Sequence, residues 1–294
     1  MYVANTNRYD NTIYNRCGRS GLVLPRISLG MWQNFGKNAD YDTMKDIILT
    51  AFDHGITYFD LANNYGPDPG QAEINFGKIF NENLKPYRDE IIIATKAGYE
   101  MWPGPYGGRG GSRKYLTASL DQSLKRMGID YVDIFYHHCL DPDTPLKETA
   151  LCMSDIVRQG KSLYIGMSNY DGKKMHRMYH KCDDYNVPFV VNQNRYNILD
   201  RQVEYNSLKK ECFSKHKGLV AFSPLAQGRL SDKFRNGIPE SSRLYGKPDY
   251  CKRIGLDDAQ LQYISSLCEI ADKRGETLSQ MAIQWLLKKG VTSV

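Results

Sequence analysis

The sequence predicts an α/β protein that folds as one (β/α)8 TIM barrel domain over residues 1–294. Three observations support this fold class. Short apolar runs alternate with amphipathic helical stretches along most of the chain, as the βα units of a parallel sheet do. Seven such units in one chain favour a closed barrel over an open sheet. The Gly-x-Gly-x-x-Gly motif expected at the first turn of an open dinucleotide-binding sheet does not occur.

The predicted strands are rich in Ile, Val, Phe and Tyr and are apolar on both faces. This pattern is typical of strands that are covered on both sides in a parallel sheet. Most of these runs end in a polar residue, and in a barrel all of these ends meet at one face. The strands are expected at residues 24–29, 57–60, 91–96, 131–138, 163–168, 189–193 and 219–223.

The predicted helices lie between these runs and after the last one. In the first, Met44, Ile48 and Phe52 fall on one stripe, and Gly55 ends the helix. The others repeat the pattern with their own apolar stripes. The helices are expected at residues 41–52, 116–127, 145–157, 257–273 and 277–288.

Three segments lie outside the repeat. Residues 12–24 contain a glycine turn between apolar stretches and predict a hairpin that covers the bottom of the barrel. Residues 229–255 are polar and punctuated by Pro and Gly, which indicates a long loop over the opposite face. Residues 291–294 are expected to begin an eighth strand. We therefore expect the eighth βα unit to be truncated, with an incomplete strand and helix and an unpaired strand edge.

Composition excludes several classes of function. Hydrophobic residues make up 41% of the chain and charged residues 24%, and no apolar run has the length of a membrane span or a signal peptide. The net charge of +6 is spread along the chain without a basic stripe, so no nucleic-acid partner is expected. The seven cysteines are scattered, which predicts neither disulfides nor a zinc site and fits a cytoplasmic protein.

Four polar residues at the predicted strand ends suit the reduction of a carbonyl group: Asp60, Tyr65, Lys96 and His138. A hydride that reaches a carbonyl carbon leaves an alkoxide, which a tyrosine hydroxyl can protonate. We expect the lysine to lower the pKa of Tyr65 and the aspartate to hold the lysine. A neutral histidine can orient the carbonyl oxygen. The alternative of a metal at His137 and His138 is disfavoured, because neighbours on a strand point to opposite faces, so no metal is expected.

Several motifs resemble those of the aldo-keto reductases. They run in order along the chain as residues 30–32, 59–66, 94–96, 131–138, 166–169, 192–193 and 222–228. Within that family, residues 63–67, 101–107 and 111–116 resemble the bacterial L-glyceraldehyde 3-phosphate reductase group, which is related to the potassium-channel β-subunits. The resemblance implies that Asp60, Tyr65, Lys96 and His138 are the catalytic residues.

The same resemblance implies a binding site for a nicotinamide cofactor. Ser168, Asn169 and Gln193 match residues that bind the carboxamide, and Phe222 matches the aromatic ring that stacks on the nicotinamide. Trp32 lies beside the nicotinamide ribose and the substrate, and Asp60 and Tyr65 border the same pocket. The pyrophosphate loop is expected to contain Ser223, Leu225, Gln227 and Lys233. Substrate contacts are expected from Trp32, Tyr65, Trp102 and Arg113, the last of which could reach a substrate phosphate.

The resemblance therefore implies NADPH-dependent reduction of aldehydes such as L-glyceraldehyde 3-phosphate or methylglyoxal, with Tyr65 as the proton donor. The partner would be a small aldehyde or ketone, with no membrane or nucleic acid, and self-association into a homo-oligomer stays open. The choice between NADPH and NADH is also open, because the family's usual 2′-phosphate-binding segment would follow Val294. An alternative is a regulatory subunit that binds a nicotinamide nucleotide with little turnover.

Overall fold

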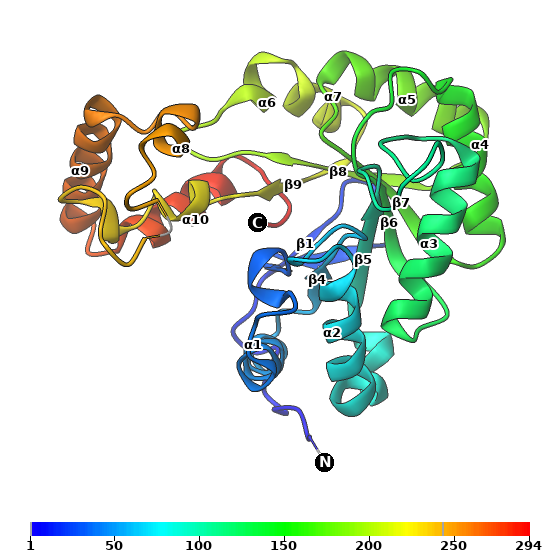
Figure 1. Cartoon of the computed structure of the whole chain (residues 1–294), viewed down its shortest axis with the longest axis horizontal. Helices are drawn as coiled ribbons and strands as arrows, with labels where there is room; N and C mark the ends of the chain where they lie inside the picture. The colour runs from blue at the N-terminus through cyan, green and yellow to red at the C-terminus, as the bar shows by residue number, and fades with distance from the viewer. Residues whose placement is uncertain (1, 243) are drawn as a thin grey trace.

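The computed structural model describes residues 2–242 and 244–294 and confirms the barrel-like α/β fold. Seven parallel strands form one curved sheet in the order β3-β4-β5-β6-β7-β8-β9, with each strand paired to the next along the chain (Figure 1). The strands of this sheet are β3 (Leu29–Gly30), β4 (Tyr58–Asp60), β5 (Ile92–Ala97), β6 (Val132–His137), β7 (Ser162–Ser168), β8 (Phe189–Arg195) and β9 (Gly218–Phe222).

The end of the chain closes the ring of strands. On one side, Thr292 N–H donates to the carbonyl of Leu219 at 2.7 Å, and Ser293 forms a parallel bridge with Val220. On the other side, Val294 N–H donates to the Arg26 carbonyl at 3.0 Å. The expectation of an unpaired edge at this eighth strand was wrong, because a strand of three residues is long enough to form backbone hydrogen bonds on both sides.

The predicted hairpin is present and fills one end of the barrel. β1 (Tyr14–Arg16) pairs antiparallel with β2 (Val23–Pro25). Leu24 is fully buried and packs with Cys17, Tyr136 and Val191 in the barrel interior. The expected strand at residues 24–29 was wrong in one respect: its first part belongs to β2 and its end to β3, because the chain leaves the hairpin before it enters the barrel.

The helices pack outside the sheet, and the main hydrophobic core lies between these two layers (Figure 1). Their N-termini are capped where the sequence provides an acceptor, as by Asp40 and Ser112. None of the helices in residues 2–242 and 244–294 is long and apolar enough to cross a membrane. The helices of the barrel are α1 (Tyr41–Asp53), α2 (Gln71–Ile79), α3 (Arg113–Met127), α4 (Leu146–Arg158), α5 (Gly172–Asp184), α6 (Gln202–Tyr205) and α7 (Leu208–Ser214), with short 3-10 or π turns η1 (Gln33–Phe35), η2 (Phe80–Leu84) and η3 (Lys85–Glu90).

A second hydrophobic core lies in a group of helices after β9, drawn at the left of Figure 1. Its elements are η4 (Ala226–Gly228), η5 (Asp232–Phe234), α8 (Pro248–Arg253), α9 (Asp258–Lys273) and α10 (Leu278–Lys288). The expected long loop at residues 229–255 therefore contains two helical turns, and its Leu230, Phe234 and Cys251 are buried in this core. Residue 243 of that segment lies outside the described residues.

Candidate active site

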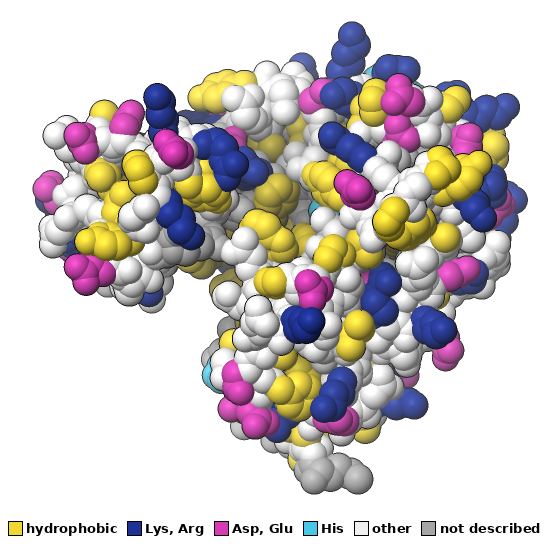
Figure 2. Space-filling view, viewed as in Figure 1, with side chains coloured by type: hydrophobic (Ala, Val, Ile, Leu, Met, Phe, Trp, Pro, Cys, Tyr) yellow, Lys and Arg dark blue, Asp and Glu magenta, His cyan; other side chains and the backbone are white. Residues whose placement is uncertain are grey.

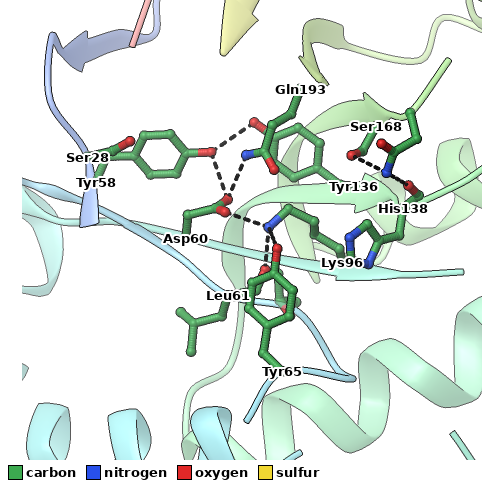
Figure 3. Close-up of polar contacts among 12 residues, drawn as sticks. Ser28, Tyr58, Asp60, Leu61, Tyr65, Lys96, Tyr136, His138, Ser168 and Gln193 are labelled. Carbon is green, nitrogen blue, oxygen red and sulfur yellow. Dashed lines mark hydrogen bonds and ion pairs between the residues drawn. The ribbon is translucent and has the colours of Figure 1, made fainter. Parts of the chain in front are cut away.

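The ends of β4, β5 and β6 bring the four predicted catalytic residues together (Figure 3). Lys96 Nζ donates to Asp60 Oδ2 at 2.6 Å and lies 3.4 Å from the hydroxyl of Tyr65. The ring of Tyr65, in the turn after β4, meets the ring of His138 edge to face with centroids 5.8 Å apart. A phenol hydroxyl, a cation beside it and an imidazole thus share one end of the barrel.

The ammonium of Lys96 contacts three oxygen atoms, from Asp60, the Leu61 carbonyl and the Tyr65 hydroxyl. Its side chain is fully buried, and it donates to the Leu61 carbonyl at 2.7 Å as well as to Asp60. Burial lowers the pKa of Lys96, and the carboxylate of Asp60 opposes this shift. Asp60 also accepts from Gln193 Nε2 at 3.0 Å and from the Tyr58 hydroxyl at 3.2 Å. The carboxylate of Asp60 is therefore fixed by two neutral donors and by Lys96, and the ammonium of Lys96 by a neutral acceptor and by Asp60.

Tyr65 differs from the expectation in its acidity. Burial raises its pKa well above 10, and the nearby carboxylate of Asp60 and the ring of Tyr99 raise it further. The prediction that Lys96 lowers the pKa of Tyr65 is therefore wrong for the protein without ligand. The physical reason is that Asp60 is closer to Lys96 than Tyr65 is, so it compensates the ammonium charge. Tyr65 is consequently a neutral hydroxyl group that can donate a proton.

His138 is a neutral imidazole. Burial lowers its pKa well below 6.5, and the positive charge of Lys96 lowers it further. Within residues 2–242 and 244–294, its buried Nδ1 has no hydrogen-bond partner. His137 instead contacts the Tyr170 hydroxyl through Nδ1 at 2.7 Å. The side chains of His137 and His138 thus contact different residues, because neighbouring side chains of a strand point to opposite faces.

Two adjoining cavities open at this end of the barrel, with volumes of about 540 and 270 Å³. Trp32, Tyr65, Phe222, Ser223 and Gln227 line both of them. Predicted site residues that line one cavity are Asp60, Gln193 and Leu225 in the larger and His138 and Asn169 in the smaller. Ser168 is buried beneath them, and its Oγ accepts from Asn169 Nδ2 at 3.2 Å.

Five predicted site residues do not line these cavities: Lys96 and Ser168 contact residues that do, whereas Trp102, Arg113 and Lys233 have other surroundings. Arg113 forms an ion pair with Asp155 on α4. Trp102 stacks on Tyr115 with ring centroids 5.5 Å apart. Lys233 is exposed on η5. None of these three is among the described residues that line the two cavities.

The smaller cavity also contains residues that the sequence analysis did not single out: Asn64, Tyr99 and Arg195. Tyr99 packs edge to face on His138, with centroids 4.6 Å apart. Arg195 ends β8 two residues after Gln193. Since alternate residues of a strand share a face, this spacing was the signal that could have identified Arg195.

Known proteins resemble this chain over most of its length. The model of the "Aldo/keto reductase family" matches residues 26–294. An L-glyceraldehyde 3-phosphate reductase of Escherichia coli O157:H7 is 49% identical over 100% of this chain and 86% of its own length. A probable voltage-gated potassium channel subunit beta of Arabidopsis thaliana is 36% identical over 92% of this chain and 82% of its own.

A solved structure gives the same result for the fold. The crystal structure of a thermostable aldo-keto reductase in complex with the inhibitor epalrestat superposes with a TM-score of 0.73 and 31% sequence identity. The match covers 96% of this chain and 87% of the other. Together with the family match and the relatives, it shows that this chain belongs to the aldo/keto reductase family of oxidoreductases.

Proposed function

We propose that this protein reduces small aldehydes to alcohols with NADPH, and that L-glyceraldehyde 3-phosphate or methylglyoxal is among its substrates. The observation that carries the proposal is the contact of the Lys96 ammonium, itself held by Asp60, with the hydroxyl of Tyr65 at the cavity that His138 lines. The names of the two Escherichia coli relatives support an aldehyde phosphate as substrate.

The residues of the larger cavity fit a nicotinamide cofactor. The cavity extends from Ile27 and Val294 at the barrel wall to Tyr65, and Phe222 offers an aromatic face within it. Gln193 adds an amide that can bind a carboxamide. Ser223, Leu225 and Gln227 supply a loop for the phosphates, while Trp32 stands at the mouth with 48% of its surface exposed. The cofactor supplies the hydride when it is bound.

The side chains account for the proton and for the charge. As the carbonyl carbon gains the hydride, the carbonyl oxygen takes the proton of the Tyr65 hydroxyl, and an alcohol forms. The phenolate left on Tyr65 faces the Lys96 ammonium, which stabilises it until solvent returns a proton. The neutral ring of His138 can hydrogen-bond the carbonyl oxygen, because its low pKa keeps it uncharged near pH 7. These roles need no change of charge on Asp60.

The test is the oxidation of NADPH followed at 340 nm with glyceraldehyde 3-phosphate and methylglyoxal. Tyr65→Phe removes the proton and keeps the ring, so its kcat is expected to fall by about 10²- to 10⁴-fold. Tyr106→Phe is the matched control, since Tyr106 is 57% exposed and lines neither cavity. A kcat of Tyr65→Phe equal to that of the Tyr106→Phe control would overturn the proposal. Binding of NADPH by the unmodified protein without any turnover would favour the nucleotide-binding regulatory subunit.

A further inference from the structure

A third cavity of about 530 Å³ adjoins the one that contains Tyr65 and His138. Arg195, Ser223 and Gln227 line both of them. The third cavity lies between the loop after β8, the loop after β9 and the segment that joins α8 to α9. Its charged lining residues are Arg195, Asp200, Arg201, Arg229 and Arg253. Four cations therefore face one anion beside the reaction site.

Two of the four arginines, Arg229 and Arg253, form no ion pair with a carboxylate in residues 2–242 and 244–294. Arg201 is paired with Glu204, whereas Arg195 approaches Asp200 only to 3.8 Å. Arg229 donates to the carbonyls of Ala226 at 3.0 Å and Ile254 at 3.2 Å, which are neutral acceptors. Burial lowers the pKa of Arg229, and the charge of Arg195 lowers it further. A bound anion would relieve this repulsion.

Arg253 adds a fourth charge at the rim. It lies against the ring of Tyr250 with its guanidinium carbon 4.6 Å from the centroid. Within residues 2–242 and 244–294 no ion pair of Arg253 with a carboxylate is found. Figure 2 shows Lys and Arg side chains beside the hollow between the barrel and the group of helices α8, α9 and α10.

The walls of this cavity are tied together by a buried side chain. Asn197 is 2% exposed, and its Nδ2 donates to the Ser223 carbonyl at 2.9 Å. Its Oδ1 accepts from the backbone N–H groups of Leu199 and Asp200 at 2.9 and 2.8 Å. The loop after β8 is thereby fixed to the loop after β9. The spacing between the cavity and the reaction site is set by the fold and needs no movement of the loops.

Arg195 stands where the two cavities meet. It is the register partner of Phe222 at the open end of β8 and β9, and its guanidinium lies 5.8 Å from the Phe222 ring. A guanidinium binds a phosphate or carboxylate through two parallel hydrogen bonds. An aldehyde whose carbonyl lies between Tyr65 and His138 can therefore direct a charged tail toward Arg195.

We propose that this arginine-lined cavity binds the anionic group of the substrate, a phosphate or a carboxylate, with Arg195 as the residue that selects charged over uncharged aldehydes. This inference rests on the proposed function, because it assigns the distal part of the same substrate. It gives the specificity for a charged tail to the loops after β8 and β9 and not to Arg113, which is engaged by Asp155.

The test compares the kcat/KM for glyceraldehyde 3-phosphate with that for glyceraldehyde in Arg195→Gln. For Arg195→Gln, kcat/KM for the phosphorylated substrate is expected to fall about tenfold, which is about 1.4 kcal/mol. For glyceraldehyde, which has no charged tail, the loss is expected to be smaller, so the ratio of kcat/KM for the phosphorylated to the unphosphorylated substrate falls. Arg158→Gln is the matched control, since Arg158 is an exposed arginine on α4 that lines none of the three cavities. Equal losses for both substrates would overturn the inference.

Two further measurements distinguish a site for the substrate anion from a role of Arg195 in cofactor binding and from a failure of the proposed function. Cofactor affinity, measured by NADPH fluorescence, is expected to be the same in Arg195→Gln and in the unmodified protein. A loss confined to NADPH binding would assign the arginine to the cofactor and refute the proposal. Titration with inorganic phosphate needs no turnover and tests the cavity even if aldehyde reduction fails. Heat of binding in the unmodified protein and its loss in Arg195→Gln support the site, whereas no binding in either protein overturns it.

Discussion

Replacing Asp60 by asparagine would leave the ammonium of Lys96 buried without its counter-charge. The side chain of Lys96 is fully buried and that of Asp60 is 10% exposed. At their separation of 2.6 Å, two unit charges attract by about 6 kcal/mol at an effective dielectric constant near 20. Desolvation offsets much of this attraction. Removal of one partner from such a pair costs about 3–5 kcal/mol, and we expect this loss in the free energy of unfolding of Asp60→Asn.

The reverse change is expected to be milder. In Lys96→Met, the carboxylate of Asp60 keeps its hydrogen bonds from Tyr58 and Gln193, so the loss should be about 1–3 kcal/mol. The double variant has no unpaired buried charge and should be no less stable than Asp60→Asn alone. Urea unfolding of the four proteins followed by circular dichroism measures this coupling. The reasoning is refuted if Asp60→Asn costs less than about 1 kcal/mol, or if the two single losses simply add.

Two other predictions concern stability. Burial lowers the pKa of His137 to about 4, so below its ordinary value of 6.5 the unfolded chain binds a proton that the folded protein does not. The free energy of unfolding should therefore fall by about 3 kcal/mol as the pH decreases from about 6.5 to about 4, and urea titrations at several pH values should show a shallower fall in His137→Gln. Equal slopes for the two proteins would contradict this assignment. Gly166→Ala would place a methyl group 2.3 Å from the ring of Tyr136, so the ring must move and the urea midpoint should decrease by the equivalent of about 1–3 kcal/mol. An unchanged midpoint would show that the barrel interior has room for this methyl group.

The fold was largely predictable because the repeat has a simple physical origin. Buried parallel strands must be apolar on both faces, and helices that cover them must be amphipathic, so both leave strong patterns in the sequence. The split of residues 24–29 between β2 and β3 was not predictable, since one apolar run can serve two strands when the chain bends inside it. The helical turns within residues 229–255 were missed because Gly and Pro residues there punctuate short turns as well as loops.

The candidate site was predictable to the extent that it lies at strand ends. Asp60, Lys96 and His138 follow from the barrel rule that all strands deliver their last residues to one face. The raised pKa of Tyr65 could not be predicted from the sequence, because it depends on distances among three buried groups that the spacing of residues does not encode. Arg113 was expected near the substrate because it follows a strand, yet its partner Asp155 lies on the next helix. Such pairing across helices becomes visible only in three dimensions.

The short strand that closes the barrel gives this protein an unusually long-range contact. The hydroxyl of Ser28 donates to the carbonyl of Val294, across a sequence separation of 266 residues. The loop-closure entropy of such a pair must be overcome before the contact contributes any stability, so this seam should form late in folding. The seam also lies in the wall of the larger cavity, where Ile27, Ser28 and Val294 meet. A seam expected to form late thus lies next to the proposed cofactor site, and a ligand bound there should slow hydrogen exchange of the backbone amides of Ser28 and Val294.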